Sequence, residues 1–432
     1  MFRLQQLIQT KKARIGIIGQ GYVGLPLAIE FAAYGFRVTG FEIDPSKVKS
    51  IQAGKSYIQD VTDQTLSVLV KSGKLSASSD FKRMSSMDVV IICVPTPLRK
   101  SKDPDISYIV AAVDQIDRYL RKGQLIILES TTYPGTTREI ILPRLERRGF
   151  KAGRDFFLAF SPERVDPGNK KYGIKNTPKV VGGITPQGTR LAQALYETIV
   201  DQVIPVSSTE AAEMVKLLEN TFRAVNIGLV NEVALMCERL KMDVWEVIDA
   251  AATKPFGFMP FYPGPGLGGH CIPLDPHYLS WKLKTLNFYA RFIELAGEIN
   301  AHMPEYLVAK IGNALNQRSR SVKQSKILVL GVAYKKDIGD VRESPALDVI
   351  ELLKEKGADV IYHDPFVQNL KIGNQHFRSV PLNPGVLKKQ HCVVITTNHS
   401  CFQIKEILLH SKLVVDSRNA TRGIQSPKIV KL

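Results

Sequence analysis

Short apolar runs alternate with helical patterns over the first half of the chain. The run RIGIIG ends in a glycine, an amphipathic stretch follows it, and FRVTGFEID then returns to strand character. Apolar strands that alternate with helices are typical of a doubly wound parallel sheet. We predict strands at 14–19, 36–44, 88–97, 124–132, 156–165 and 178–183, with helices at 20–35 and 106–123.

The pattern changes near Ser208. Residues 208–254 form one long helical pattern with no glycine-proline punctuation, although a single glycine, Gly228, lies inside it. A helix this long commonly bridges domains or forms the core of a dimer. A second long helical pattern covers residues 288–317.

The last part of the chain repeats the strand and helix pattern of the first. From Lys326, KILVLGVAYKKDIGDVRESPALDVIELLKEKGADVIYHDP again gives a strand, a loop, a helix and a strand, and it ends in Asp-Pro as 14–45 does. This weak internal repeat predicts two Rossmann-like α/β domains joined by a helical middle, with boundaries at 1–207, 208–318 and 319–432. The second copy lacks a GxGxxG, so it binds any nucleotide by a different loop.

Composition narrows the class of protein. A chain of 432 residues is too long for one core. It has no apolar run of about 18 residues and no secretory signal at its N-terminus, so we expect no membrane span. Five scattered cysteines without a CxxC suggest neither a disulfide framework nor a common zinc site, and favour a cytoplasmic location. The net charge of +17 is spread along the chain, which suits a small polyanionic ligand better than nucleic acid.

A cofactor site is predicted at the first strand-helix junction. Gly19, Gly21 and Gly24 form a GxGxxG that follows a strand and opens a helix, and Glu42 ends the next strand about twenty residues later. The helix N-terminus would face a pyrophosphate. The Glu42 carboxylate could accept hydrogen bonds from ribose hydroxyls and would repel a 2′-phosphate, so NAD is favoured over NADP.

The motifs together resemble those of the UDP-glucose/GDP-mannose dehydrogenase family along the whole chain. The resemblance is carried by GQGYVGLPLA, VPTP, ESTTYPGTT, SPERVDPG, EAAEMVKLLENTFRAVNIGLVNE, GPGLGGHCIPLDP, YKKDIGDVRESPA and VVDSRNATRG, in the family's order. The form GHCIPLDP is similar to the branch that acts on UDP-N-acetylhexosamines. The resemblance implies an NAD-binding N-terminal domain, a central dimerisation domain and a C-terminal domain for UDP.

The implied reaction oxidises the sugar C6 alcohol to a carboxylate with two NAD, for surface polysaccharides. Removing two hydrides without losing the aldehyde calls for an activated thiol, which would form a thiohemiacetal and then a thioester. Cys271 is the candidate nucleophile, because the glycines at 266, 268 and 269 are expected to leave room for a sugar. A zinc ligand, a disulfide half and an inert buried thiol are the alternatives.

Further residues receive roles from the resemblance. Lys216 and Asn220 lie four apart on one helix and could stabilise an oxyanion, although Glu213 and Lys216 could instead form an ordinary exposed ion pair. Asp275, Glu163 and Thr132 are candidates for base or water-orienting work, and the sequence does not divide that work among them and Lys216. Expected cofactor contacts also come from Tyr22, Val23, Thr96, Thr132 and Arg342. Expected substrate contacts come from Glu163, Arg164, Lys216, Asn220, Arg223, Tyr262, Gly268, His270, Lys335 and Arg418.

Several alternatives stay open. UDP-N-acetylglucosamine is the first candidate substrate, and UDP-N-acetylmannosamine, UDP-N-acetylgalactosamine, UDP-glucose and GDP-mannose are the others. His270 could contact the N-acetyl group, tune the thiol or only shape its loop. No metal is expected. A homodimer or a higher homo-oligomer is expected from the resemblance. A non-catalytic nucleotide-sugar-binding protein is the hypothesis from another class.

Overall fold

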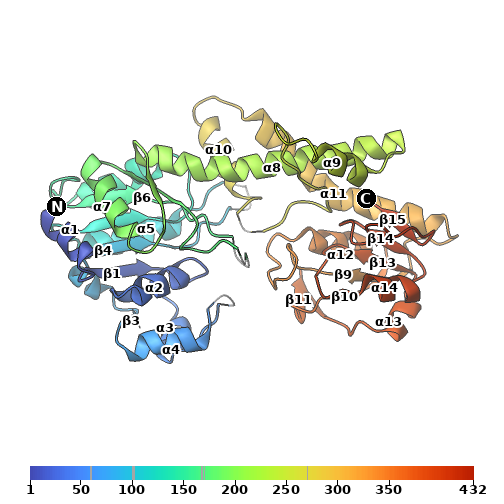
Figure 1. Cartoon of the computed structure of the whole chain (residues 1–432), viewed down its shortest axis with the longest axis horizontal. Helices are drawn as coiled ribbons and strands as arrows, with labels where there is room; N and C mark the ends of the chain where they lie inside the picture. The colour runs from blue at the N-terminus through green and yellow to red at the C-terminus, as the bar shows by residue number, and fades with distance from the viewer. Residues whose placement is uncertain (59–60, 100–102, 167–168, 170, 270) are drawn as a thin grey trace. The chain divides into compact units, whose positions relative to one another are not determined.

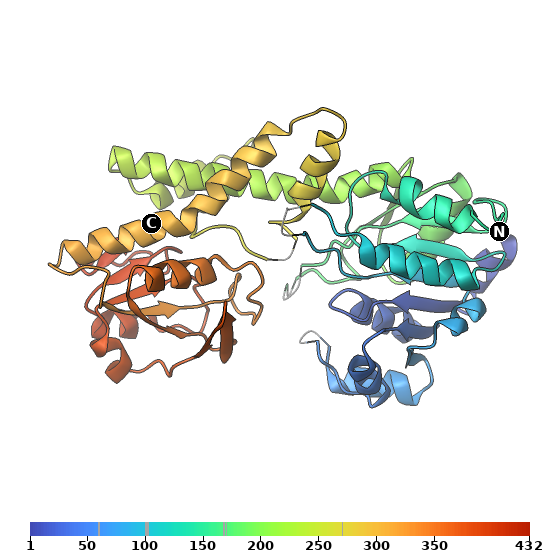
Figure 2. The same cartoon turned by 180° about the vertical axis from the view of Figure 1, so that it is seen from behind.

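The structure, a computed structural model, describes residues 1–58, 61–99, 103–166, 169, 171–269 and 271–432. By its internal contacts the chain divides into two units (Figures 1 and 2). The N-terminal unit comprises Met1–Glu219 and His277–Asn287, and the C-terminal unit comprises Asn220–Pro276 and Phe288–Leu432. The predicted three-domain boundaries remain a prediction.

The N-terminal unit is built on one eight-stranded sheet. Its first six strands are parallel, β7 runs antiparallel to β6, and β8 is parallel to β7. The order reverses between β1 and β4, which is the switch point where Rossmann folds bind ligands. In sheet order the strands are β3 (Leu75–Ser78), β2 (Arg37–Phe41), β1 (Arg14–Ile18), β4 (Val89–Ile92), β5 (Leu125–Leu128), β6 (Phe157–Phe160), β7 (Lys179–Gly183) and β8 (Val203–Pro205).

The strands are apolar on both faces because helices cover both faces. In β4, Val89 and Ile91 face one core, and Val90 and Ile92 face the other. The first core is completed by α1, α2, α4 and α7, and the second by α5, α6 and η1. The helices are α1 (Phe2–Gln9), α2 (Gly24–Ala33), α3 (Pro45–Gln52), α4 (Asp63–Lys71), η1 (Phe81–Ser86), α5 (Ser107–Tyr119), η2 (Thr137–Ile141), α6 (Leu142–Glu146) and α7 (Pro186–Tyr196).

The long central helix is shorter than predicted. The structure ends α8 (Thr209–Leu240) where Lys241 adopts a left-handed φ of 58°, and a separate α9 (Val244–Ala251) follows. Asp243 caps α9, because its carboxylate accepts the N–H of Trp245 at 2.9 Å. The cap signal was present in the sequence, but the uninterrupted apolar pattern concealed it.

The C-terminal unit is a second, smaller Rossmann-like domain. Its parallel sheet has the order β10 (Asp359–His363), β9 (Lys326–Leu330), β13 (Cys392–Ile395), β14 (Val414–Asp416) and β15 (Ile429–Lys431). The long helix α11 (Arg291–Asn316) and α12 (Pro345–Glu355) pack on one face. Helices α13 (Pro384–Lys389) and α14 (Ile404–His410) pack on the other, and β11 (Asn369–Ile372) and β12 (Gln375–Arg378) form a separate hairpin. Helix α10 (Asp275–Lys284) lies between α9 and α11 in sequence.

The predicted internal repeat is visible in the backbone. Gly19 ends β1 with a φ of 88°, and its N–H donates to the carbonyl of Phe41 at 2.8 Å. Gly331 ends β9 with a φ of 81°, and its N–H donates to the carbonyl of His363 at 2.9 Å. Both glycines are required, because a Cβ would lie 2.5 Å or less from a backbone oxygen of the neighbouring strand's loop. The predicted fold of two Rossmann-like domains with a helical middle is therefore confirmed.

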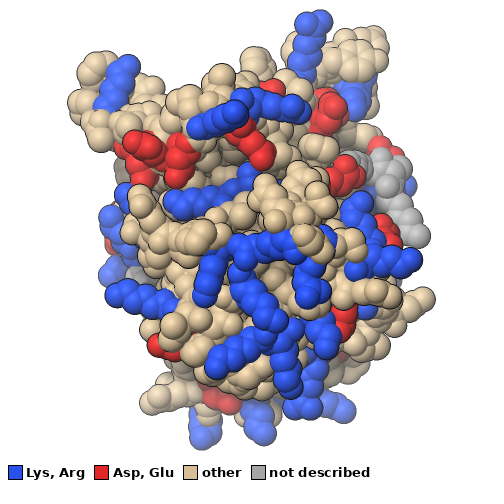
Figure 3. Space-filling model, turned by 90° about the vertical axis from the view of Figure 1, so that its right-hand side faces the viewer, with Lys and Arg blue, Asp and Glu red and all other residues tan. Residues whose placement is uncertain are grey.

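Positive charge gathers on one face of the C-terminal unit (Figure 3). At the amino ends of β9 and β13, burial and then the charges of Arg320, Lys412 and Lys326 lower the pKa of His391. This edge is opposite the carboxyl ends of the same strands, where Rossmann domains bind nucleotides.

Among the described residues, no helix has the length and apolar composition needed to cross a bilayer.

Candidate functional site

The glycine loop after β1 has the geometry of a dinucleotide site. A Cβ on Gly24 would lie 1.9 Å from the carbonyl oxygen of Gly19, so this glycine permits close packing of α2 on the loop. A Cβ on Gly21 would meet nothing within 4 Å. The backbone at Gly21 is therefore open on the side from which a pyrophosphate would approach, at the amino end of α2. Tyr22 is half exposed and Val23 is partly buried in the same turn.

Glu42 lies directly after β2 and is held against the glycine loop. Its Oε2 accepts the N–H of Gln20 at 2.9 Å, and its Oε1 accepts the N–H of Ile43 at 2.9 Å. Its Oε1 also accepts the N–H of Asp44 at 3.2 Å, and Glu42 is 7% exposed. A carboxylate has about four acceptor positions, so one position remains for a ribose hydroxyl. The loop and this carboxylate fit an NAD molecule.

The loop after β5 carries ESTTYPGTT and is anchored by Glu213 of α8. Glu213 accepts the N–H groups of Gly135 at 2.6 Å and Thr137 at 2.9 Å, and the Thr137 hydroxyl at 2.7 Å. Burial raises the pKa of the Glu213 carboxyl to about 7 even though these donors lower it. Glu213 is fully buried, so the alternative of an exposed Glu213–Lys216 ion pair is wrong.

Thr132 is buried within this loop. The Thr132 hydroxyl lies 2.7 Å from the Thr136 hydroxyl. The Thr136 hydroxyl donates its own proton to the carbonyl of Tyr133 at 2.8 Å. Thr132 therefore donates to Thr136, and only its acceptor side is left for a water. The adjacent Thr131 is partly exposed, so its hydroxyl is better placed to meet a ligand.

Glu163, three residues after the end of β6, is placed near Lys216 of α8. The Glu163 Oε1 accepts the N–H groups of Arg164 at 2.8 Å and Val165 at 2.6 Å. Burial by itself raises the pKa of Glu163, but Lys179, the Val165 N–H and Lys216 lower it to about 2. The predicted residues Glu163 and Lys216 are thus brought within electrostatic reach. The Arg164 side chain instead pairs with Glu219 at 2.6 Å.

Most of α10 packs on the N-terminal unit. The Tyr278 hydroxyl donates to the Thr96 carbonyl at 2.6 Å, and Trp281 packs against Tyr133 with ring centroids 5.1 Å apart. Thr96, predicted to contact the cofactor, thus has its backbone position fixed by Tyr278. No local pattern predicts this contact, because it joins residues 182 apart.

Cys271 lies at the amino end of α10, in the C-terminal unit. Its carbonyl accepts the N–H groups of Leu274 at 3.0 Å and Asp275 at 2.8 Å, which forms the first turn of the helix. The thiol is partly exposed and is in no disulfide. The positive end of a helix dipole favours a thiolate over a thiol.

The glycines before Cys271 have a different role from the predicted one. A Cβ on Gly268 would lie 2.7 Å from the Tyr334 Cβ, and one on Gly266 would lie 2.9 Å from the Pro345 Cβ. A Cβ on Gly269 would meet the Tyr334 ring at 3.0 Å. The space beside these glycines is filled by the protein itself, so the expectation that they leave room for a sugar is wrong at these positions.

Asp275 is hydrogen-bonded to Asn220, a residue 55 positions away in the sequence. The Asn220 Nδ2 donates to the Asp275 Oδ2 at 2.5 Å, and both side chains are buried. This hydrogen bond therefore fixes the orientation of the Asn220 amide. In the sequence, Asp275 lies four residues after Cys271. Lys216 lies one helical turn before Asn220 on α8 and is 9% exposed.

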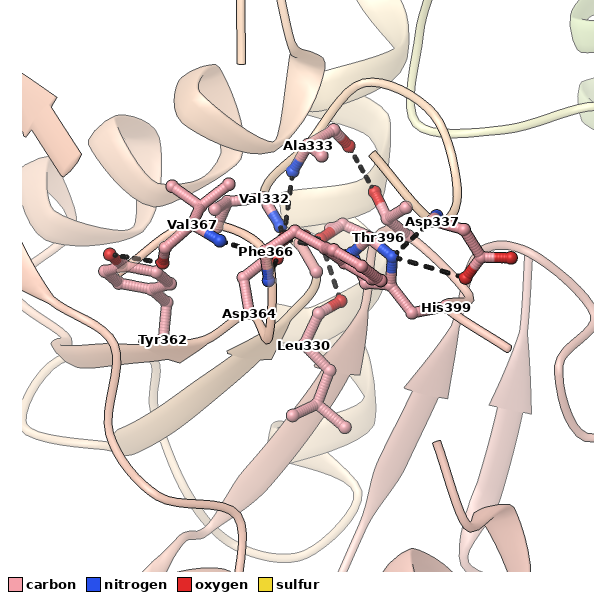
Figure 4. A network of polar contacts seen from close by, with 12 residues as sticks. Leu330, Val332, Ala333, Asp337, Tyr362, Asp364, Phe366, Val367, Thr396 and His399 are labelled. Atoms are coloured by element: carbon pink, nitrogen blue, oxygen red, sulfur yellow. Dashed lines mark hydrogen bonds and ion pairs between the residues drawn. The ribbon is translucent and has the colours of Figure 1, made fainter. Parts of the chain in front are cut away.

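The loop after β9 is held by a buried pair, Asp364 and His399 (Figure 4). Asp364 accepts the N–H groups of Val332 at 2.7 Å and Ala333 at 3.2 Å, and lies 3.0 Å from the His399 Nε2. The His399 Nδ1 accepts the Asp337 N–H at 2.9 Å, so Nε2 carries the ring proton. Burial raises the pKa of Asp364, but the bond from His399 and these N–H groups lower it overall.

Asp364 takes the place in the second copy that Glu42 takes in the first. It also accepts the N–H groups of Phe366 and Val367, and it is 0% exposed. Its acceptor positions are filled, so it cannot bind a ribose as Glu42 can. A nucleotide at the C-terminal unit would have to be held by other groups.

The remaining predicted substrate residues lie mainly in the C-terminal unit. Arg418 follows β14, donates to the Thr396 carbonyl at 2.9 Å, and burial lowers its pKa to about 10. Arg342, which was predicted to contact the cofactor, is paired with Asp340 at 2.6 Å, and its carbonyl accepts the Gly269 N–H. Tyr262 donates to Asp249 at 2.8 Å, Arg223 is exposed, and Lys335 is partly buried. His270 lies outside the described residues.

Comparisons with known proteins cover nearly the whole chain. The family models describe the NAD binding domain of the UDP-glucose/GDP-mannose dehydrogenase family at residues 13–200, its central domain at 210–302 and its UDP binding domain at 328–423. The chain belongs to the UDP-glucose/GDP-mannose dehydrogenase family. The predicted resemblance is confirmed. The chain is therefore an NAD-dependent dehydrogenase with a UDP-binding C-terminal domain.

Two relatives and one solved structure show how close the similarity is. UDP-N-acetyl-D-mannosamine dehydrogenase of Pyrococcus horikoshii is 35% identical over 94% of this chain and 95% of its own. UDP-N-acetyl-D-glucosamine 6-dehydrogenase of Pseudomonas aeruginosa is 35% identical over 83% of this chain and 84% of its own. A solved UDP-D-ManNAc dehydrogenase from Pyrococcus horikoshii superposes with a TM-score of 0.88 at 34% identity, covering 97% and 98% of the two chains.

The family assignment agrees with the site chemistry. NAD, predicted from the loop and Glu42, is confirmed as the cofactor. Among the described residues, no group of three or more His, Cys, Asp or Glu side chains could hold a metal ion. The sequence interpretation missed Glu129, Lys179, Tyr278 and His399, which are buried or bonded at the sites, because only the fold brings their partners to them.

Two glycine substitutions should separate cofactor binding from stability. In Gly21→Ala, the new Cβ meets no protein atom but occupies the face open to the pyrophosphate, so NAD affinity should fall about tenfold or more with an unchanged unfolding midpoint. In Gly24→Ala, the Cβ collides with backbone, and stability should fall by about 2 kcal/mol or more. NAD titration and thermal unfolding measure both effects. Equal NAD affinity in Gly21→Ala would contradict the assigned approach.

His399→Leu should weaken UDP binding about tenfold and leave NAD binding unchanged. The substitution removes the acceptor of the Asp337 N–H and one partner of Asp364, so the loop that carries Lys335 loses its anchor. Calorimetric titration with UDP and with NAD measures both. His410→Leu is the matched control, because His410 pairs with the exposed Glu406 of its own helix. Unchanged UDP affinity in His399→Leu would show that the pair does not position the nucleotide loop.

Proposed function

We propose that this protein catalyses the four-electron oxidation of the C6 hydroxyl of a UDP-N-acetylhexosamine to a uronic acid. One observation carries the proposal: an NAD loop, a partly exposed Cys271 at a helix amino end, and a UDP-binding domain occur in one chain. The relatives named for N-acetylmannosamine and N-acetylglucosamine support the substrate class. We further propose that the product serves surface polysaccharide synthesis and that the enzyme works in the cytoplasm.

The chemistry requires a thiol that retains the aldehyde. NAD would supply the oxidant, with two molecules bound in succession and one hydride accepted by each. The Cys271 sulfur adds to the aldehyde carbon to give a thiohemiacetal, and loss of the second hydride leaves a thioester. Water then adds to the carbonyl carbon, the carbon–sulfur bond breaks, and the thiolate is regenerated with the free acid.

We assign supporting roles to the residues around these steps. Lys216 and Asn220 would stabilise the oxyanion of each tetrahedral intermediate, because an ammonium and an amide both donate to developing negative charge. Asp275 holds the Asn220 amide in position, which supports this role. Glu163 would act on the hydrolytic water, and Thr131 is a better candidate than Thr132 for orienting a water because its side chain is less buried.

A panel of nucleotide sugars distinguishes the candidate hexosamines. UDP-N-acetylglucosamine is our first candidate. UDP-N-acetylmannosamine is the second, and it is favoured by a relative of equal identity that covers more of the chain. The epimers differ at C2 or C4, and a panel that includes UDP-N-acetylgalactosamine and UDP-glucose, ranked by kcat/KM, distinguishes them.

The stoichiometry of NADH tests the proposal. With limiting UDP-N-acetylhexosamine, two NADH should form per sugar, and Cys271→Ala should lower kcat about a thousandfold or more. Cys401→Ala is the matched control, because Cys401 is an exposed thiol far along the chain, and it should retain full activity. One NADH per sugar, full activity in Cys271→Ala, or binding of UDP-sugar with no NADH would each reject the proposal.

A homodimer is proposed from the exposed apolar face of the central helices. Phe222, Leu229 and Met236 recur every seven residues on α8 and are 45%, 52% and 49% exposed, and Phe292 of α11 is 77% exposed. An exposed apolar stripe of this kind is stabilised when it packs against a second helix. Sedimentation velocity should show a dimer or a larger assembly, and Leu229→Glu with Met236→Glu should give monomers. A monomeric wild-type protein would refute this proposal.

A further inference from the structure

A buried charge network lies at the carboxyl edge of the N-terminal sheet. Three of its members, Glu129, Glu163 and Lys179, come from three consecutive strands of that sheet. Strands β5 and β6 are parallel, so Glu129 and Glu163, which follow them, lie at the same edge. Strand β7 runs the opposite way, with Phe160 paired to Gly182. This reversal brings Lys179, the first residue of β7, to the edge where β5 and β6 end.

The Lys179 ammonium lies between the two carboxylates, and Tyr196 binds one of them. The Lys179 ammonium contacts the Glu129 Oε1 and lies 3.4 Å from the Glu163 Oε2. The Tyr196 hydroxyl of α7 donates to the Glu129 Oε2 at 2.6 Å, and the Lys179 ammonium lies 4.9 Å from the centre of the Tyr196 ring. The side chains of Glu129 and Lys179 are 0% and 6% exposed, whereas that of Glu163 is 17% exposed. Glu163 is therefore the member that reaches outward.

Two carboxylates share one ammonium in this network, and burial together with that ammonium sets the pKa of each carboxyl. Burial raises the pKa of Glu129 to about 7, although Lys179 lowers it. Burial raises the pKa of Glu163 as well, but Lys179 leads the groups that bring it down to about 2. Burying three ionisable groups is costly, and well-packed apolar side chains would stabilise the fold at least as well. The arrangement therefore indicates a role for the charge on Glu163.

We propose that Lys179 is a positioning residue for Glu163: held by Glu129 and Tyr196, its ammonium fixes the Glu163 carboxylate for its work on the hydrolytic water. This inference rests on the proposed function. In that step the water oxygen bonds to the thioester carbon, the carbon–sulfur bond breaks, sulfur leaves as the Cys271 thiolate, and the water proton passes through Glu163 to solvent. Lys179 touches no reacting atom.

Lys179→Met tests the proposal through the pH profile. Without the ammonium, the effect of burial is opposed only by weaker groups such as the Val165 N–H and Lys216, so the pKa of Glu163 rises. Glu163 is then protonated at low pH and becomes ionised only as pH rises. At pH 7, kcat should fall about a hundredfold. The ratio of wild-type to variant kcat should then shrink about tenfold per pH unit as pH rises toward that pKa, and should level off above it. Acid-quenched variant should carry the sugar covalently, because thioester hydrolysis is the slowed step.

Companion variants keep the test decisive if Lys179→Met folds poorly. Glu129→Gln with Lys179→Met removes one charge of each sign, so no second carboxylate is left unpaired, and it should show the same pH-dependent loss. Lys179→Arg keeps a cation and should restore the wild-type profile to within about threefold. Lys122→Met removes an exposed lysine from the same unit and should change nothing.

The outcomes separate this inference from the proposed function. If wild type gives two NADH per sugar, then a pH-independent loss in the double variant, or no accumulation of the covalent sugar, overturns the role of Lys179 alone. One NADH per sugar in wild type overturns the proposed function and this inference with it. The expected pattern of pH-dependent loss, covalent sugar and rescue by arginine supports the role.

Discussion

Buried carboxylates that accept backbone N–H groups hold the loops of this enzyme in place. A loop that leaves the carboxyl end of a parallel strand has N–H groups with no strand partner, and these must be satisfied. Glu42 satisfies them for the NAD loop, Glu213 for the loop after β5, and Asp364 for the loop after β9. In each case a carboxylate distant in sequence fixes a loop that carries chemistry.

The two Rossmann-like copies use this device to different ends. Glu42 accepts three N–H groups and keeps one acceptor position for a ribose hydroxyl, which suits a dinucleotide site. Asp364 is enclosed by four N–H groups and His399, so it acts only as an anchor. The same position in a repeated fold has become a ligand-binding group in one copy and a structural one in the other.

Much of the fold and part of the site could be predicted from the sequence. The strands have continuous apolar runs because both faces are covered, and Gly19, Gly21 and Gly24 have a spacing that only a tight strand-helix turn explains. The end of α8 was predicted too late, because the apolar pattern continued past the Asp243 cap. The role of the glycines before Cys271 was also misjudged, because sequence shows that a side chain is missing but not what fills the space.

By itself, the sequence determined the fold class, the NAD site and the candidate thiol, since these depend on local periodicity, turn chemistry and motif spacing. Only the tertiary structure showed that Glu213 anchors a loop and is no partner of Lys216, that Asn220 is bonded to Asp275, and that Lys179 lies between Glu129 and Glu163. Those contacts join residues from separate strands and helices. Their partners are set by sheet order and strand direction, and β7 reverses a direction that no local pattern specifies.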